Sequence, residues 1–309
     1  GIRSGAFDSC TAVESIHLTK GTGSMTNHYN GPFTDAPWYI SSVDSLSVIL
    51  DEGILNIGNN TFCDCTNLKS ITIPNSVTRI GEDAFANCAG LTEIVIPNSV
   101  TYLSGFRGCS NLTSITIPNS VTEIGDRAFS GCSGFSTIVI PESVTRIGID
   151  AFAYCTELTE VRIPDSVTYL SGFRGCSNLA DVSIGSGVER IGQYAFSECT
   201  ALTGITLPDG LTTIDAYAFS NSGLIRINIP NGVTQFSSGF RNCADLTEIT
   251  IPESVTILDS YAFSGCSSLA RITIPESITR IGGYAFSGCT ALTALTIDRK
   301  STRLNSSHG

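Results

Sequence analysis

A single pattern recurs along nearly the whole chain and constrains the fold more than any other feature. Its clearest copy is segment 112–132, LTSITIPNSVTEIGDRAFSGC, and its general form is L-x-x-I-x-I-P-x-S-V-T-x-I-G-x-x-A-F-x-x-C. Successive copies lie 21, 22 or 23 residues apart. A unit of this size cannot bury its own apolar side chains, so neighbouring units must stack and share one core. The repeat therefore predicts a solenoid. The proline slot is filled by Pro74, Pro97, Pro118, Pro141, Pro164, Pro208, Pro230, Pro252 and Pro275, and by Gly185 and Asp298.

Each unit is expected to contain a strand, a second short extended stretch and a turn. The L-x-x-I-x-I run alternates as a strand does and ends at proline, which cannot donate to a ladder. Ile115 and Ile117 are predicted to point inward, and Ser114 and Thr116 outward. The following V-T-x-I stretch is also extended, and the A-F-x-x-C segment is predicted to form one helical or 3₁₀ turn that buries Phe129. We therefore expect a parallel β-sheet on one face of the solenoid, with short extended stretches and helical or 3₁₀ turns on the other.

The same run of residues, with its period, resembles the BspA-type leucine-rich repeat of bacterial surface proteins and of surface proteins in some parasitic protists. About ten units match, so the resemblance covers nearly the whole chain. It implies a secreted or surface-displayed binding module that adheres to host extracellular matrix proteins, such as fibronectin or fibrinogen. The family has no catalytic motif, and the resemblance therefore supplies no active-site residue.

Composition and motifs exclude several other functions. Charged residues make up 15% of the chain and the net charge is −11, which argues against nucleic-acid binding because that needs a basic surface. No stretch approaches the roughly 20 apolar residues of a membrane span. The chain contains no G-x-S-x-G motif, no Walker loop, and no histidine or cysteine set at metal or triad spacing. We expect neither enzymatic activity nor a cofactor.

The chain has 12 cysteines, and all but one keep the phase of the repeat. One cysteine per unit predicts a row of buried, reduced thiols, because parallel side chains in a packed row do not favour bridging. Cys63 is out of phase, at a variable position that is expected to face solvent. A reactive thiol, an intermolecular bridge and a neutral substitution all remain open for it. The in-phase set is Cys10, Cys65, Cys88, Cys109, Cys132, Cys155, Cys176, Cys199, Cys243, Cys266 and Cys289.

We predict a single solenoid domain over residues 1–297, interrupted by a loop insertion at about 19–45. The insertion contains turn signals and the only Trp. Trp38, with Tyr39 and Phe33, either stacks on a ligand or pins the loop to the solenoid. Segment 298–309, DRKSTRLNSSHG, resembles the translation of a sequencing adapter, as in a fragment from environmental DNA. We expect it to be a disordered, non-native tail.

The candidate contact surface is the outward face of the predicted sheet. Serine and threonine dominate its two outward columns, as expected for half-exposed strands. Four charged residues interrupt these columns: Glu160, Arg162, Asp181 and Arg226. They are the positions at which we expect a protein partner to be recognised.

A longer period of 67 residues overlies the repeat. It places Arg107, Arg174 and Arg241 at equivalent positions in units with a shortened S-G-F-R turn. Three units at about 4.8 Å each would put these arginines about 14 Å apart, as a basic row suited to a repetitive partner. Duplication of three-unit blocks accounts for the same pattern. A tyrosine column is open to two interpretations, a contact stripe or stacked packing: Tyr194, Tyr217, Tyr261 and Tyr284.

The leading functional hypothesis is a non-catalytic adhesion module at the cell surface or outside the cell. The alternative is a structural spacer, or a self-associating rod that displays another domain.

Overall fold

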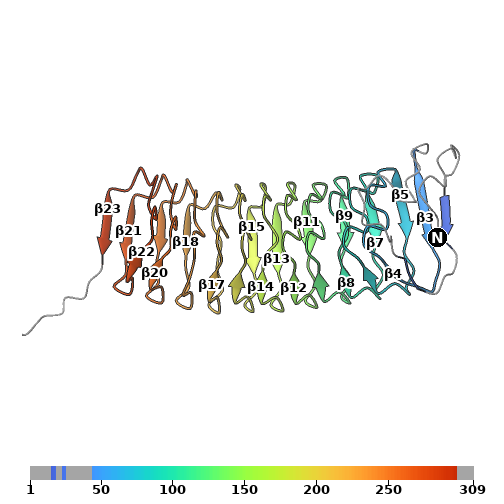
Figure 1. Cartoon of the computed structure of the whole chain (residues 1–309), viewed down its shortest axis with the longest axis horizontal. Coiled ribbons are helices and arrows are strands. Elements are labelled where there is room, and N and C mark those ends of the chain that lie inside the picture. The colour runs from blue at the N-terminus through green and yellow to red at the C-terminus, as the bar shows by residue number, and fades with distance from the viewer. Residues whose placement is uncertain (1–14, 19–22, 26–43, 298–309) are drawn as a thin grey trace, which may run out of the picture.

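The computed structural model describes residues 15–18, 23–25 and 44–297, and over this range the chain forms a parallel β-solenoid of about 11 turns. Figure 1 shows the turns stacked along one axis into an elongated rod that ends at β23. Every strand pair within the described range is parallel, because equivalent segments of successive repeats lie side by side. The predicted solenoid is confirmed.

Two sets of strands are stacked along the rod axis, and each set forms one face of the rod. The strands of the first strand face come from the L-x-x-I-x-I runs, and those of the second strand face from the V-T-x-I runs. The first face contains β1 (Ser15–Leu18), β3 (Leu46–Leu50), β5 (Leu68–Thr72), β7 (Glu93–Val95), β9 (Ser114–Thr116), β11 (Thr137–Val139), β13 (Glu160–Ile163), β15 (Asp181–Ile184), β18 (Arg226–Asn228), β19 (Glu248–Thr250), β21 (Arg271–Ile274) and β23 (Ala294–Ile297). The second contains β2 (Gly23–Met25), β4 (Ile54–Ile57), β6 (Arg79–Ile80), β8 (Tyr102–Leu103), β10 (Glu123–Ile124), β12 (Arg146–Ile147), β14 (Tyr169–Leu170), β16 (Arg190–Ile191), β17 (Thr213–Ile214), β20 (Ile257–Leu258) and β22 (Arg280–Ile281).

The two faces differ in continuity. On the second face, nine strands from β2 to β17 form one sheet, whereas the first face is divided into shorter groups. One division falls at residues 203–206, where the repeat continues but no strand forms. Gly204 occupies an outward position there, and glycine weakens a strand because it has no side chain to pack. Strand β2 lies inside the segment expected to be a loop and pairs with β4, so the solenoid takes up part of that segment.

Each turn contributes the same buried side chains to a single core. In the turn at 112–132, the side chains of Leu112, Val121, Ile124, Phe129 and Cys132 are fully buried. Full burial of such side chains stabilises the fold by about 1.5–3 kcal/mol each before the cost in chain entropy.

The phenylalanines form a stacked column through the core. Neighbouring rings have centroids 5.2–6.1 Å apart and planes within 16° of parallel. One ring per turn therefore sets the spacing of the turns on this side of the core. The column consists of Phe62, Phe85, Phe106, Phe129, Phe152, Phe173, Phe196, Phe219, Phe240, Phe263 and Phe286.

The helical or 3₁₀ turn predicted for the A-F-x-x-C segment is wrong: no helix forms within the described residues. The backbone N–H groups of this segment alternate between two kinds of partner. Those of Phe129 and Gly131 bond to the next turn of the solenoid, whereas those of Ser130 and Cys132 bond to the carbonyl three residues earlier in their own turn. The amide of Phe62 donates to the Ala84 carbonyl at 2.6 Å, and that of Phe129 to the Ala151 carbonyl at 2.7 Å. These bonds make a third ladder along the rod. We call the surface of the A-F-x-x-C segments, including the residue before the Ala-Phe pair, the turn edge.

The in-phase cysteines lie beside the phenylalanine column, and all those in the described range are free thiols. From Cys88 onward, each in-phase thiol donates to the carbonyl of the phenylalanine one turn earlier, as Cys109 does to Phe85 at 3.1 Å. The prediction of buried, unbridged thiols is confirmed for the described cysteines, although Cys289 in the last turn is only partly buried. The expectation that Cys63 faces solvent is wrong. Its side chain is 3% exposed and its thiol donates to the Asp64 carboxylate.

Candidate binding surfaces

The first strand face brings three of the four predicted charged residues together. Glu160 and Asp181 are register partners on β13 and β15, and Arg162 follows on β13 beside Ser183. The Arg162 guanidinium pairs with Glu142 at 3.0 Å, with both side chains more than half exposed. Among the described residues, Glu160 and Asp181 have no ion-pair partner. Two exposed carboxylates thus lie on adjacent strands, next to an arginine that is already paired.

Arg226 lies on the same face but outside this cluster. It begins β18, beyond the turn at 203–206 that forms no strand, and its register partner is Glu248 on β19. Its charge therefore belongs to the C-terminal part of the face.

Two exposed apolar residues on the first strand face were not among the predicted site residues. Val95 and Val139 are 82% and 80% exposed. They stand on β7 and β11 in the outward column where most other turns carry Thr or Ser, and Val139 is the register partner of Arg162. Valine in place of Thr or Ser at these two outward positions was the sequence signal that could have identified them. Val139 thus places an exposed apolar side chain directly beside the charged cluster.

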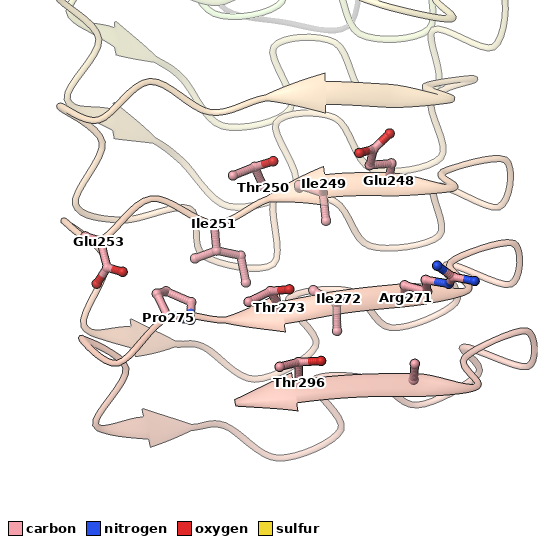
Figure 2. Close-up of a pocket in the computed structure, with 11 residues that line it drawn as sticks. Glu248, Ile249, Thr250, Ile251, Glu253, Arg271, Ile272, Thr273, Pro275 and Thr296 are labelled. Carbon is pink, nitrogen blue, oxygen red and sulfur yellow. The ribbon is translucent and has the colours of Figure 1, made fainter. Parts of the chain in front are cut away.

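A shallow groove of about 360 Å³ crosses the C-terminal part of the first strand face. Figure 2 shows Thr250, Thr273 and Thr296 in a row across three strands, with Glu248 and Arg271 at the starts of β19 and β21. The groove forms where β19 and β21 belong to separate hydrogen-bonded groups. Its hydroxyl row, together with Arg271 and the carboxylates of Glu248 and Glu253, offers hydrogen bonds to an extended partner.

The turn edge carries the three arginines of the 67-residue period, and they are not equivalent. Arg107 donates through Nε and Nη2 to both carboxylate oxygens of Asp83, at 2.9 and 3.1 Å. This hydrogen bonding raises the pKa of the guanidinium above its ordinary value. Arg174 donates to Oε1 of Glu198 at 3.1 Å. The Nε of Arg241 is buried and has no hydrogen-bond partner among the described residues.

The tyrosine column of the turn edge consists of two stacked pairs. Tyr194 lies on Tyr217 and Tyr261 lies on Tyr284, each pair with ring centroids 5.3 Å apart. The pairs pack along the rod axis, so their ring faces are largely used by each other. Tyr284 is nevertheless 69% exposed.

The remaining predicted site residue, Trp38, lies outside the described residues. Within the described range, no group of three or more His, Cys, Asp or Glu side chains could hold a metal ion. No helix in that range is long and apolar enough to cross a membrane.

Comparison with solved structures places the rod among bacterial leucine-rich-repeat proteins. A leucine-rich cell surface protein from Faecalibacterium prausnitzii is 28% identical with a TM-score of 0.57, over 93% of this chain and 88% of that one. A leucine-rich repeat protein from Bacteroides ovatus is 30% identical with a TM-score of 0.54, over 79% and 78% of the two chains. The pneumococcal vaccine antigen PcpA, 19% identical, shares the fold with a TM-score of 0.56 over 96% and 80%. No curated protein matches the chain.

The family model described as "BspA type Leucine rich repeat region" matches in six copies. They span residues 1–105, 39–134, 104–172, 123–239, 169–293 and 237–308. These matches cover almost the whole chain, in agreement with the repeat pattern and the observed solenoid. The chain belongs to the BspA-type leucine-rich-repeat family.

Proposed function

We propose that the protein is a non-catalytic binding and adhesion module of the cell surface or the extracellular space, and that its first strand face contacts a protein partner. The family and the similarity to a cell surface protein of Faecalibacterium prausnitzii support the surface location. The partner class we propose is a host extracellular matrix protein.

The observation that carries the proposal is the exposure of Val139 beside a charged cluster, with a second exposed valine, Val95, two turns away on the same face. Threonine is sufficient at an outward strand position that contacts only water, and neighbouring turns carry threonine there. Valine exposed to 80% or more leaves apolar area in water, and burying such area against a partner is favourable by about 25 cal/mol per Å². Interfaces combine a central apolar anchor with polar and charged neighbours that set specificity. Val139, Arg162 and Glu160 provide this combination on two adjacent strands.

Binding of the full chain to immobilised fibronectin and fibrinogen tests the proposal. The double variant Val95→Thr/Val139→Thr should weaken binding at least about tenfold, because it removes the apolar anchors while keeping strand propensity. The double variant Glu160→Gln/Asp181→Asn tests the carboxylate pair in the same way. Asn228→Thr on the same face, remote from the cluster, is the matched control and should bind as the parent chain does.

The outcomes separate the proposal from its alternative. Binding that is unchanged in both double variants would contradict a contact surface at this cluster. Failure to bind any matrix protein, together with concentration-dependent self-association in sedimentation, would favour the spacer or self-associating rod.

A further inference from the structure

We propose that Arg241 on the turn edge is a receptor for a carboxylate of the partner protein, an Asp or Glu side chain next to an apolar residue. The inference rests on the proposed protein-binding function, but it uses a different surface from the first strand face. Its basis is a comparison of three equivalent arginines within one chain.

Two of the three arginines have a carboxylate partner from a neighbouring turn. The partner of Arg107 is Asp83, 24 residues earlier, and that of Arg174 is Glu198, 24 residues later. The equivalent positions around Arg241 are Tyr217 and Gly265. The third copy of the 67-residue block therefore contains the arginine but neither of the two carboxylates that pair with it in the other copies.

One other neighbour of Arg241, a tyrosine ring from the next turn, has a counterpart at Arg174. The Arg174 guanidinium lies over the Tyr194 ring at 5.2 Å, and the Arg241 guanidinium lies over the Tyr261 ring at 5.1 Å. The ring face holds the planar guanidinium in one orientation, as in cation–π contacts generally. Arg241 thus keeps the tyrosine contact of Arg174, yet within the described residues it forms no ion pair.

The unused hydrogen-bonding capacity of Arg241 is specific. Its Nε–H is buried and has no partner in the described part of the chain, whereas the Nε–H of Arg107 donates to Asp83 at 2.9 Å. A buried donor without a partner is unfavourable, and a carboxylate matches the guanidinium fork with two parallel hydrogen bonds. An internal carboxylate accepts hydrogen bonds from each of the two equivalent arginines, whereas Tyr217 and Gly265 supply none to Arg241, so an acidic side chain of the partner fits its unpaired guanidinium.

The neighbouring surface favours a protein segment over a free anion. Tyr284 stacks on Tyr261 and is 69% exposed, so an apolar side chain next to the acidic one would bury ring surface. The whole chain has a net charge of −11, which disfavours long-range capture of anions. Recognition must therefore come from the short-range fit of the fork and the ring edge.

The test uses a fluorescein-labelled peptide of alternating Gly, Glu and Leu, titrated with the full chain in about 0.15 M salt, where the Debye length is about 8 Å. Arg241→Gln should weaken binding at least about tenfold, since it removes the fork and the charge. Tyr217→Asp keeps Arg241 but places an internal carboxylate where Asp83 stands beside Arg107. It should weaken binding to a similar extent by occupying the fork.

Arg107→Gln is the matched control, because it removes an arginine that is already paired, and it should bind like the parent chain. Circular dichroism and thermal midpoints of all variants exclude unfolding as the cause. Parental binding by both Arg241→Gln and Tyr217→Asp would overturn the proposal, as would equal weakening in Arg107→Gln. Tighter binding of inorganic phosphate than of the peptide would overturn the assignment to a carboxylate.

The same titration distinguishes this site from the first strand face. Val95→Thr/Val139→Thr should leave peptide binding unchanged while it weakens matrix binding. If matrix binding fails and peptide binding persists, the proposed matrix partner is wrong and the Arg241 site stands.

Discussion

At the scale of single residues, the turn edge depends on two left-handed backbone positions in most repeats. One precedes the Ala-Phe pair and the other lies two residues after the phenylalanine. Asp83 and Asn87 occupy them in one turn with φ of 53° and 58°, and Arg127 and Gly131 in another with φ of 54° and 75°. This conformation costs most residues about 1–2 kcal/mol, whereas Gly, Asn and Asp adopt it more readily. Turns that carry Arg or Tyr at these positions therefore hold a local excess of free energy.

Arg127→Asn should accordingly stabilise the protein by about 0.5–1 kcal/mol, because the new residue tolerates the left-handed conformation. The backbone hydrogen bond from residue 127 to the Ile149 carbonyl is retained in this variant. Chemical denaturation gives the free energy of unfolding. Arg127→Val is the opposing control and should destabilise the protein, since a β-branched residue is worst suited to positive φ. Equal stability of the two variants would contradict the argument.

The thiols provide a second prediction at this scale. Burial, followed by the charge of Asp64, raises the pKa of Cys63 to about 12, so almost no thiolate is present at pH 8. Cys289, in the last described turn, is the one partly buried thiol among the described cysteines. Reactivity requires both thiolate and access. In a Cys10→Ser background, iodoacetamide at pH 8 should therefore label Cys289 before any other cysteine, as read by peptide mass spectrometry. Faster labelling of Cys63 would show that its side chain reaches solvent.

At the scale of one element, the glycine that follows six of the second-face strands, β4, β6, β10, β12, β16 and β22, affects how closely the turns approach. A Cβ added at Gly148 would lie 2.4 Å from the Asp126 nitrogen and 2.5 Å from the Gly125 carbonyl carbon, both backbone atoms of the preceding turn. Backbone cannot rotate aside as a flexible side chain does. The close packing of the two turns therefore excludes a side chain at Gly148.

Gly148→Ala should destabilise the protein by about 1–3 kcal/mol through overpacking. Gly283 is the matched control from an adjacent position in a later turn, because nothing lies within 4 Å of a Cβ built there. Gly283→Ala should change the free energy of unfolding by no more than about 0.5 kcal/mol. Similar decreases in the free energy of unfolding for the two alanine variants would mean that the loss of glycine itself matters, and not the contact with the preceding turn.

The elements also show what the sequence could predict and what it could not. Alternating side chains revealed the first-face strands, and the A-F-x-x-C phase revealed the phenylalanine and cysteine columns. The turn was mistaken for a helix because length alone was considered. Gly131 and Asn87, two residues after phenylalanine, were signals of left-handed backbone. The pairing of Arg107 with Asp83 was missed because the two are 24 residues apart and meet only once the turns are stacked.

At the scale of the whole molecule, the described turns share one continuous core from Ile16 to Ile274. Apolar side chains become less buried at the C-terminal end of the described range, where Leu295 and Ile297 are 45% and 50% exposed. In such a rod, stability is approximately a sum of repeat and interface contributions. A property that recurs once per turn is therefore multiplied along the chain. The buried thiol is a property of this kind, and its ionisation links the stability of the rod to pH.

Stability should fall steeply as the pH rises above about 9. Burial raises the pKa of Cys109 and of Cys176 to about 12, while the unfolded chain ionises near its ordinary value of 9.0. Between these values the folded state binds more protons than the unfolded state. The stabilisation is therefore complete below pH 9 and is lost progressively up to about pH 12. The slope is about 1.4 kcal/mol per pH unit for each thiol.

Tyrosines and lysines also titrate in this range, so the thiol contribution must be isolated by difference. Cys109→Ala/Cys176→Ala removes two titrating groups. The Phe85 and Phe152 carbonyls that those thiols contact still accept backbone hydrogen bonds from Cys88 and Cys155. The variant is expected to be less stable at pH 7 because of the lost volume. Its free energy of unfolding should nevertheless decline less steeply between about pH 9.5 and 11, by about 3 kcal/mol per pH unit for the two thiols together. Parallel curves for variant and parent would show that these thiols ionise equally in the folded and unfolded states, which their burial beside the phenylalanine column does not permit.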